Sequence, residues 1–150
     1  MLSKINLIVF VMIVLGGSFL YFTSNSSYKN SVQARVYYML GNYESAYKLA
    51  KESYEEDNYN KMAHTVMTQS EISIQYEKYI NEGNKYLQKI DVISSKQDYT
   101  QEDKTRVKFM CEIMIESYDD LKPSTLTDKI LQENSKKIQK KFKQLYAELF

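Results

Sequence analysis

Few residues in this 150-residue chain are of the types that act as nucleophiles, bases or metal ligands. There is one histidine, His64, and one cysteine, Cys111. A catalytic triad or a zinc site combines several such side chains, so these two cannot form either. Cys111 lies in the apolar run of residues 109–115 and is interpreted as a buried small hydrophobe, whereas His64 is interpreted as a structural or surface residue. The sequence predicts no metal, no cofactor and no disulfide within the chain.

The carboxylates offer one spacing of interest. Glu112 and Glu116 are four residues apart, which places two carboxylates on one face of a helix. A working acid and base need a cleft that gives the two groups unequal environments, and the nearby Lys108 and Asp119 favour a solvated face instead. The chain also lacks a Gly-rich phosphate loop and a nucleophile-elbow serine. We therefore predict no catalytic residue and a non-enzymatic protein. A cell-wall enzyme or small-ligand binder is the alternative, and it would need a deep pocket with converging polar groups.

Charge is nearly balanced, with 20 Lys and Arg against 19 Asp and Glu. No overall field attracts nucleic acid, so no nucleic-acid partner is predicted. Lysines gather on one side of the last predicted helix, where Lys136 and Lys140 are candidate protein-binding residues. This side is either a solvated face or a site for an acidic partner. Its lysines are Lys136, Lys137, Lys140, Lys141 and Lys143.

Tyrosine is unusually common, with fourteen residues. A single small helix pair cannot bury all the tyrosines between residues 37 and 59, so some are expected at the surface. Tyrosine is favoured at protein interfaces, and we predict Tyr38 and Tyr59 as exposed contact residues. Packing between helices is the equally open alternative.

The N-terminal segment is apolar. Residues 5–22 carry no charge and approach the length of about 20 residues that crosses a membrane, so residues 1–24 are predicted to be a transmembrane signal-anchor in contact with the lipid bilayer. A cleaved signal peptide is the alternative. We expect a single-pass protein of the bacterial inner membrane with residues 23–150 in the periplasm, because a short N-terminus ahead of a single apolar span usually stays in the cytoplasm. The flanking positive charges do not decide between this orientation and the alternative, a cytoplasmic domain.

Residues 25–150 are predicted to be an all-α domain of about five antiparallel helices. Apolar spacing predicts helices over residues 28–40, 43–57, 60–90, 100–121 and 125–150, with Gly83 expected to interrupt the third. Thr100 and Asp103 form a capping box that starts the fourth. The first helix is expected to pack through one apolar stripe, which consists of Val32, Val36, Tyr37 and Leu40.

The segment Leu40-Gly41-Asn42-Tyr43-Glu44-Ser45-Ala46-Tyr47 resembles the turn and second helix of a tetratricopeptide repeat. The resemblance covers residues 27–60 and implies one degenerate helical hairpin, because no second copy follows in register. It places helix-packing roles on Ala34, Tyr37, Gly41, Tyr43 and Ala46.

A protein with an apolar N-terminal helix before such a hairpin is similar in architecture to accessory proteins of bacterial envelope machines, such as the periplasmic disks and stator scaffolds of flagellar motors. That resemblance implies a scaffold or adaptor that docks onto the other proteins of a membrane-associated complex. The alternative is a cytoplasm-facing receptor for soluble partners.

Overall fold

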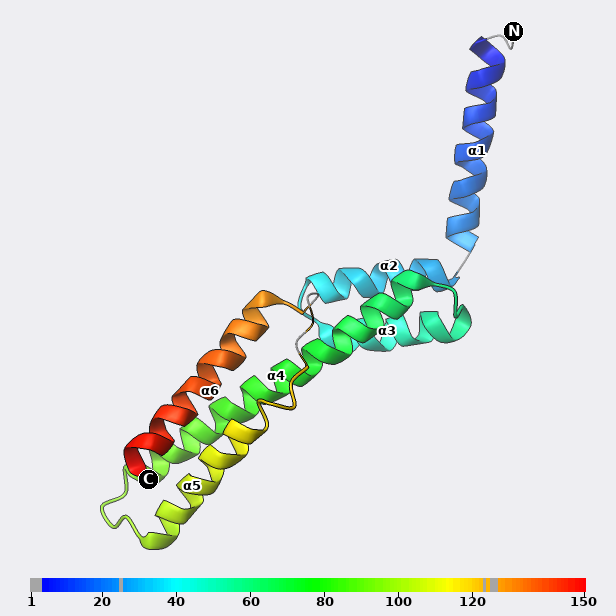
Figure 1. The fold of residues 1–150 in the computed structure, drawn as a ribbon. Coiled ribbons are helices and arrows are strands. Elements are labelled where there is room, and N and C mark those ends of the chain that lie inside the picture. The colour runs from blue at the N-terminus through cyan, green and yellow to red at the C-terminus, as the bar shows by residue number, and fades with distance from the viewer. Residues whose placement is uncertain (1–3, 25, 123, 125–126) are drawn as a thin grey trace. The chain divides into compact units, whose positions relative to one another are not determined.

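The computed structural model describes residues 4–24, 26–122, 124 and 127–150, with side chains of the first helix described from Asn6 to Ser18. All regular elements in these residues are α-helices (Figure 1). They are α1 (Lys4–Ser24), α2 (Ser26–Met39), α3 (Tyr43–Glu56), α4 (Lys61–Ser94), α5 (Gln101–Glu116) and α6 (Lys129–Leu149). Two compact units divide the chain, unit 1 with residues 1–70 and unit 2 with residues 71–150, so that α4 contributes to both.

The predicted transmembrane helix is contradicted. Over the described residues, none of the helices combines the length and the apolar composition needed to cross a membrane. The uninterrupted apolar run in the described side chains of α1 covers residues 7–15, between Asn6 and the Gly16-Gly17-Ser18 sequence. This run is well short of the roughly 20 residues that span a bilayer. The predictions of a signal-anchor, of an inner-membrane location and of a periplasmic domain therefore lose their basis.

A short turn in unit 1 joins α2 to α3, and the two helices lie side by side (Figure 1). Gly41 has φ 76°, a left-handed conformation that favours glycine. The Gly41 N–H donates to the Tyr38 carbonyl and the Asn42 N–H to the Tyr37 carbonyl, at 3.0 and 2.9 Å. These bonds are those of a Schellman motif. The Asn42 side chain then accepts a bond from the Ser45 N–H and caps α3.

The packed face of α2 consists of small residues. Ser27, Ser31 and Ala34 are buried, whereas Val32 and Val36 of the predicted stripe are about half exposed. Ala34 belongs to a cluster whose other buried members are Ala46, Ala50 and Val66. Small side chains let helices approach closely, so α2 turns its Ser and Ala residues inward and its larger apolar residues outward. The predicted inward stripe is therefore wrong for Val32, Val36 and Leu40, which are exposed, whereas Tyr37 does pack against this cluster.

A buried hydrogen-bond network explains the inward serines. Asn60, which is fully buried, donates from its amide nitrogen to the hydroxyls of Ser27 and Ser31, at 2.9 and 3.2 Å. Its amide oxygen accepts a bond from the Ala63 N–H at 3.1 Å, near the start of α4. The Ser27 hydroxyl in turn donates to the Ser53 carbonyl at 2.7 Å. One side chain thereby joins α2 to the start of α4 and satisfies buried polar groups that would be costly to leave unpaired.

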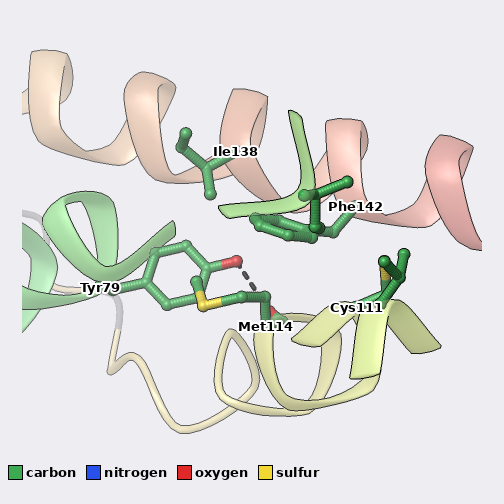
Figure 2. Packing of buried hydrophobic residues seen from close by; sticks show 7 residues of the cluster. Tyr79, Cys111, Met114, Ile138 and Phe142 are labelled. Carbon is green, nitrogen blue, oxygen red and sulfur yellow. Dashed lines mark hydrogen bonds between the residues drawn. The ribbon is translucent and has the colours of Figure 1, made fainter. Parts of the chain in front are cut away.

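The core of unit 2 is larger and more apolar. Figure 2 shows Tyr79 of α4, Cys111 and Met114 of α5, and Ile138 and Phe142 of α6 facing one another. The Tyr79 hydroxyl donates to the Met114 carbonyl at 2.9 Å, which satisfies the one polar atom of that ring. Val107 and Ile90 complete the buried cluster.

Gly83 does not interrupt α4, which is continuous from Lys61 to Ser94. It marks a close approach between α4 and α6 instead. A Cβ atom at this position would lie 2.5 Å from Cγ2 of Ile138 and 3.1 Å from Cε of Met114. Glycine is thus required by packing and not by backbone conformation.

Gly83→Ala is expected to destabilise unit 2 by about 1–3 kcal/mol, because overpacking outweighs the gain of about 1 kcal/mol that alanine brings to a helix. Urea denaturation followed by circular dichroism would measure this change. In an Ile138→Ala background, where the clashing methyl is gone, the same glycine substitution should be neutral or stabilising. Stabilisation in the wild-type background would show that α4 and α6 are not in close contact here.

Side chains close in the sequence cap the N-terminal ends of α5 and α6. Thr100 and Asp103 form the predicted capping box at the start of α5, with a 3.1 Å bond from the Asp103 N–H to the Thr100 hydroxyl. Helix α5 ends at Glu116, before the predicted Leu121. Asp128 caps α6 through a 2.8 Å bond from the Ile130 N–H. Residues 125 and 126, with which the last helix was predicted to begin, lie outside the described residues.

Candidate protein-binding surfaces

The two residues that could perform nucleophilic or base chemistry lie in different units. Cys111 is fully buried in the core of unit 2, and burial, followed by the nearby Glu112 charge, raises the pKa of its thiol. A buried thiol with a raised pKa is a poor nucleophile. His64 is exposed on α4, and its ring packs at a centroid distance of 5.2 Å against Tyr54. Among the described residues, no cluster of three His, Cys, Asp or Glu side chains is placed to hold a metal ion.

The Glu112 carboxylate contacts neighbouring side chains, whereas Glu116 is exposed to solvent. Oε1 of Glu112 accepts a bond from the Tyr146 hydroxyl at 3.1 Å and lies 3.7 Å from Nζ of Lys108. Glu116 is exposed at the end of α5. Glu112 therefore links α5 to α6 through Tyr146.

Four of the five predicted helix-packing residues are buried or half-buried in unit 1, and Gly41 is exposed. Ala34 and Ala46 are fully buried, and Tyr43 is nearly so. Tyr37 is half-buried against the same cluster. Gly41 forms the turn described above.

The two tyrosines proposed as contact residues differ in their surroundings. Tyr38 is half-buried and packs against the unit 1 cluster, with its ring 5.3 Å from that of Tyr43 in an edge-to-face arrangement. The packed side of α2 is the one opposite Val32 and Val36, and Tyr38 lies on that packed side. Tyr59 is 90% exposed in the loop before α4. Of the two, only Tyr59 offers its ring to solvent.

The exposed side chains of α2 and α3 in unit 1 differ in character. On α2 and at Leu40, the residue that follows it, four large apolar side chains are exposed at i, i+4, i+7 and i+8; we call them the α2 face. Its members are Val32, Val36, Met39 and Leu40, which are 52, 49, 75 and 76% exposed. The exposed side chains of α3 are all charged: Glu44, Lys48, Lys51, Glu52, Glu55 and Glu56. The sequence contained one indication of this arrangement: the small residues at positions 27, 31 and 34 share one face of α2. Such a face can pack closely against another helix, which leaves the larger apolar side chains of α2 exposed.

Helix α1 presents a second apolar surface. The side chains of residues 7–15 are all exposed, each by at least 45%. A helix that is apolar all round normally buries its surface in other apolar material. These side chains thus form an exposed apolar surface in addition to that of α2.

The basic side of α6 is solvated in the structure. Lys136 and Lys140 are exposed, as are the other three lysines of this helix side. Ile138 and Phe142, on the opposite side, are buried in the core of unit 2. None of these five lysines forms an ion pair with a described carboxylate.

Unit 2 also contains an open groove of about 760 Å³ between α4 and α5, which the sequence did not indicate. Five of its side chains are apolar or aromatic and four are basic. In the described part of the chain, no carboxylate is among its lining residues. The lining includes Lys85, Tyr86, Lys89, Val92, Ile93, Lys96, Arg106, Phe109 and Met110.

The chain matches no model of a known protein family, no curated protein and no solved structure. Its function is therefore inferred from the surfaces described above.

Proposed function

We propose that this protein is a non-enzymatic scaffold or adaptor that binds another protein through the α2 face. One observation carries the proposal: the exposed side chains of α2 include the large apolar residues of the α2 face beside Ser26, Lys29, Gln33 and Arg35, whereas the exposed side chains of α3 are all charged. Clustered exposed apolar side chains mark interaction sites more often than isolated ones do. Covering them releases roughly 25 cal/mol for each Å² of apolar surface removed from water.

The α2 face lies on a helix that is already ordered. The turn at Gly41 fixes α2 to α3, and Asn60 fixes α2 to the start of α4. Binding therefore requires little ordering of the backbone, which leaves more of the contact free energy for affinity. The resemblance of residues 27–60 to a tetratricopeptide hairpin, a family of protein-binding repeats, supports the same proposal.

The double substitution Val32→Gln and Val36→Gln tests the proposal. Both side chains are about half exposed, so the melting temperature should change little, whereas capture of the partner should fall at least tenfold. Quantitative affinity capture from the producing cells, with a tag at the C-terminus, measures the second effect. Lys48→Gln with Glu52→Gln on the exposed side of α3 is the matched control and should capture the partner normally. Equal capture by both double variants would refute binding through the α2 face.

A further inference from the structure

The groove of unit 2 is lined by both apolar and basic side chains. Its α4 side carries Lys85 and Lys89, the loop after α4 carries Lys96, and its α5 side carries Arg106. Val92 and Phe109, one from each helix, are 65 and 60% exposed. Large apolar side chains with this exposure at a concave surface lose contact with water when a ligand covers them.

The groove is elongated. Its α4 residues recur from Lys85 to Ile93 on one helix face, a length of about 12 Å at 1.5 Å per residue, and Lys96 follows in the loop after α4. This length corresponds to about two turns of a bound helix. Because the groove is open along its length, it fits a rod better than a compact ligand that needs enclosure.

The charges are distributed along this length. Lys96 is already paired with Asp103, at 2.8 Å between Nζ and Oδ1, and this bond is the main cause that lowers the pKa of Asp103. Among the described residues, no carboxylate forms an ion pair with Lys85, Lys89 or Arg106. Lys89 lies over the ring of Tyr86, with Nζ 5.4 Å from its centroid. Three cations thus remain available to a ligand.

The spacing of these cations distinguishes two kinds of anionic ligand. A single carboxylate head, as in a long-chain fatty acid, would be served best by cations gathered at one end of an apolar slot. Here Lys85 and Lys89 are one helical turn apart, and Arg106 stands on the other helix. A ligand with several carboxylates beside an apolar ridge matches this arrangement, and an amphipathic helix provides both.

We propose that the α4–α5 groove binds an acidic amphipathic helix of a partner protein. Apolar residues at i, i+3, i+4 and i+7 of that helix cover Val92 and Phe109. Its flanking Glu or Asp side chains pair with Lys85, Lys89 and Arg106. This site is separate from the α2 face and does not depend on the function proposed for it.

Fluorescence anisotropy with the full chain and labelled synthetic peptides tests the proposal. The probe is a peptide of about 15 residues, long enough to form a helix once bound, with leucines on one face and glutamates beside them. Its controls are a peptide with lysines in place of the glutamates and a scrambled peptide of the same composition. We expect saturable binding of the acidic helix and at least tenfold weaker binding of both controls.

Two matched charge reversals locate the site. Lys85→Glu with Lys89→Glu should weaken binding of the acidic peptide at least tenfold and improve binding of the basic one. Lys48→Glu with Lys61→Glu, at exposed positions of unit 1, changes the net charge equally and should leave binding unchanged. Circular dichroism of both double variants checks that they remain folded.

Several results would overturn the proposal. Equal loss of binding in the two double variants would show only a response to net charge. Equal binding of the scrambled peptide would show that no helix is recognised. Saturable binding of a fatty acid that displaces the acidic peptide, and that the groove reversal abolishes, would assign the groove to a small amphiphile instead.

Discussion

Phe142→Ala is expected to lower the free energy of unfolding of unit 2 by about 3–5 kcal/mol, the usual cost of truncating a buried aromatic residue. Phe142 is fully buried and packs with Met114 and Ile138 at the point where α6 approaches Gly83 (Figure 2). Alanine would leave a cavity that the glycine cannot fill. Urea denaturation followed by far-ultraviolet circular dichroism would measure the change.

Ile130→Ala is the matched control on the same helix. Ile130 is 66% exposed, so its truncation should change stability by about 0.5 kcal/mol or less. If the two variants unfold at the same urea concentration, Phe142 is not in a core and the assignment of the buried face of α6 is wrong.

Asn60→Ala is expected to destabilise unit 1 by about 2–4 kcal/mol. The substitution removes a bond to the Ala63 N–H, which is worth about 1 kcal/mol as a helix cap. It also leaves the Ser27 and Ser31 oxygens without the donor that they accept from, which costs roughly 1–3 kcal/mol in a buried site. Thermal and urea unfolding would both report the loss.

A double-mutant cycle separates the network from general damage. In a Ser27→Ala and Ser31→Ala background, Asn60→Ala should cost less than in the wild type, because the acceptors that it would orphan are already gone. Asn58→Ala, in the exposed part of the same loop, should have almost no effect. Additive costs in the cycle would mean that Asn60 acts only as a helix cap.

Features that depend on a few neighbouring residues could be predicted from the sequence. The turn at Gly41 and Asn42 follows from the left-handed conformation that glycine tolerates, and the start of α5 follows from Thr100 and Asp103. Both depend on hydrogen bonds within a few residues. The buried position of Cys111 follows from its apolar surroundings.

Features that depend on distant residues could not be predicted in the same way. The face of α2 that packs is decided by Asn60, about thirty residues later, which needs hydroxyl partners on α2. A prediction based on hydrophobicity alone therefore placed Val32 and Val36 on the buried side of α2, which is wrong. The role of Gly83 is likewise set by Ile138 on another helix.

The groove between α4 and α5 was missed for the same reason. Val92 and Phe109 belong to different helices, and their side chains line one concave surface only after those helices pack. The basic residues among them are diluted in a sequence of balanced charge. A search for lysines and arginines beside aromatic residues on two consecutive helices could have raised this possibility.

Site-specific photo-crosslinking tests the central claim, binding of a partner protein through the α2 face, most directly. A photoreactive phenylalanine analogue placed at Val36 in the full chain, in the cells that produce it, should yield a discrete crosslinked species. The same analogue at Glu52, on the charged side of α3, should yield none. Mass spectrometry of the product would identify the partner or reveal a second copy of the chain. No discrete product at Val36, or the same product from Glu52, would contradict the claim.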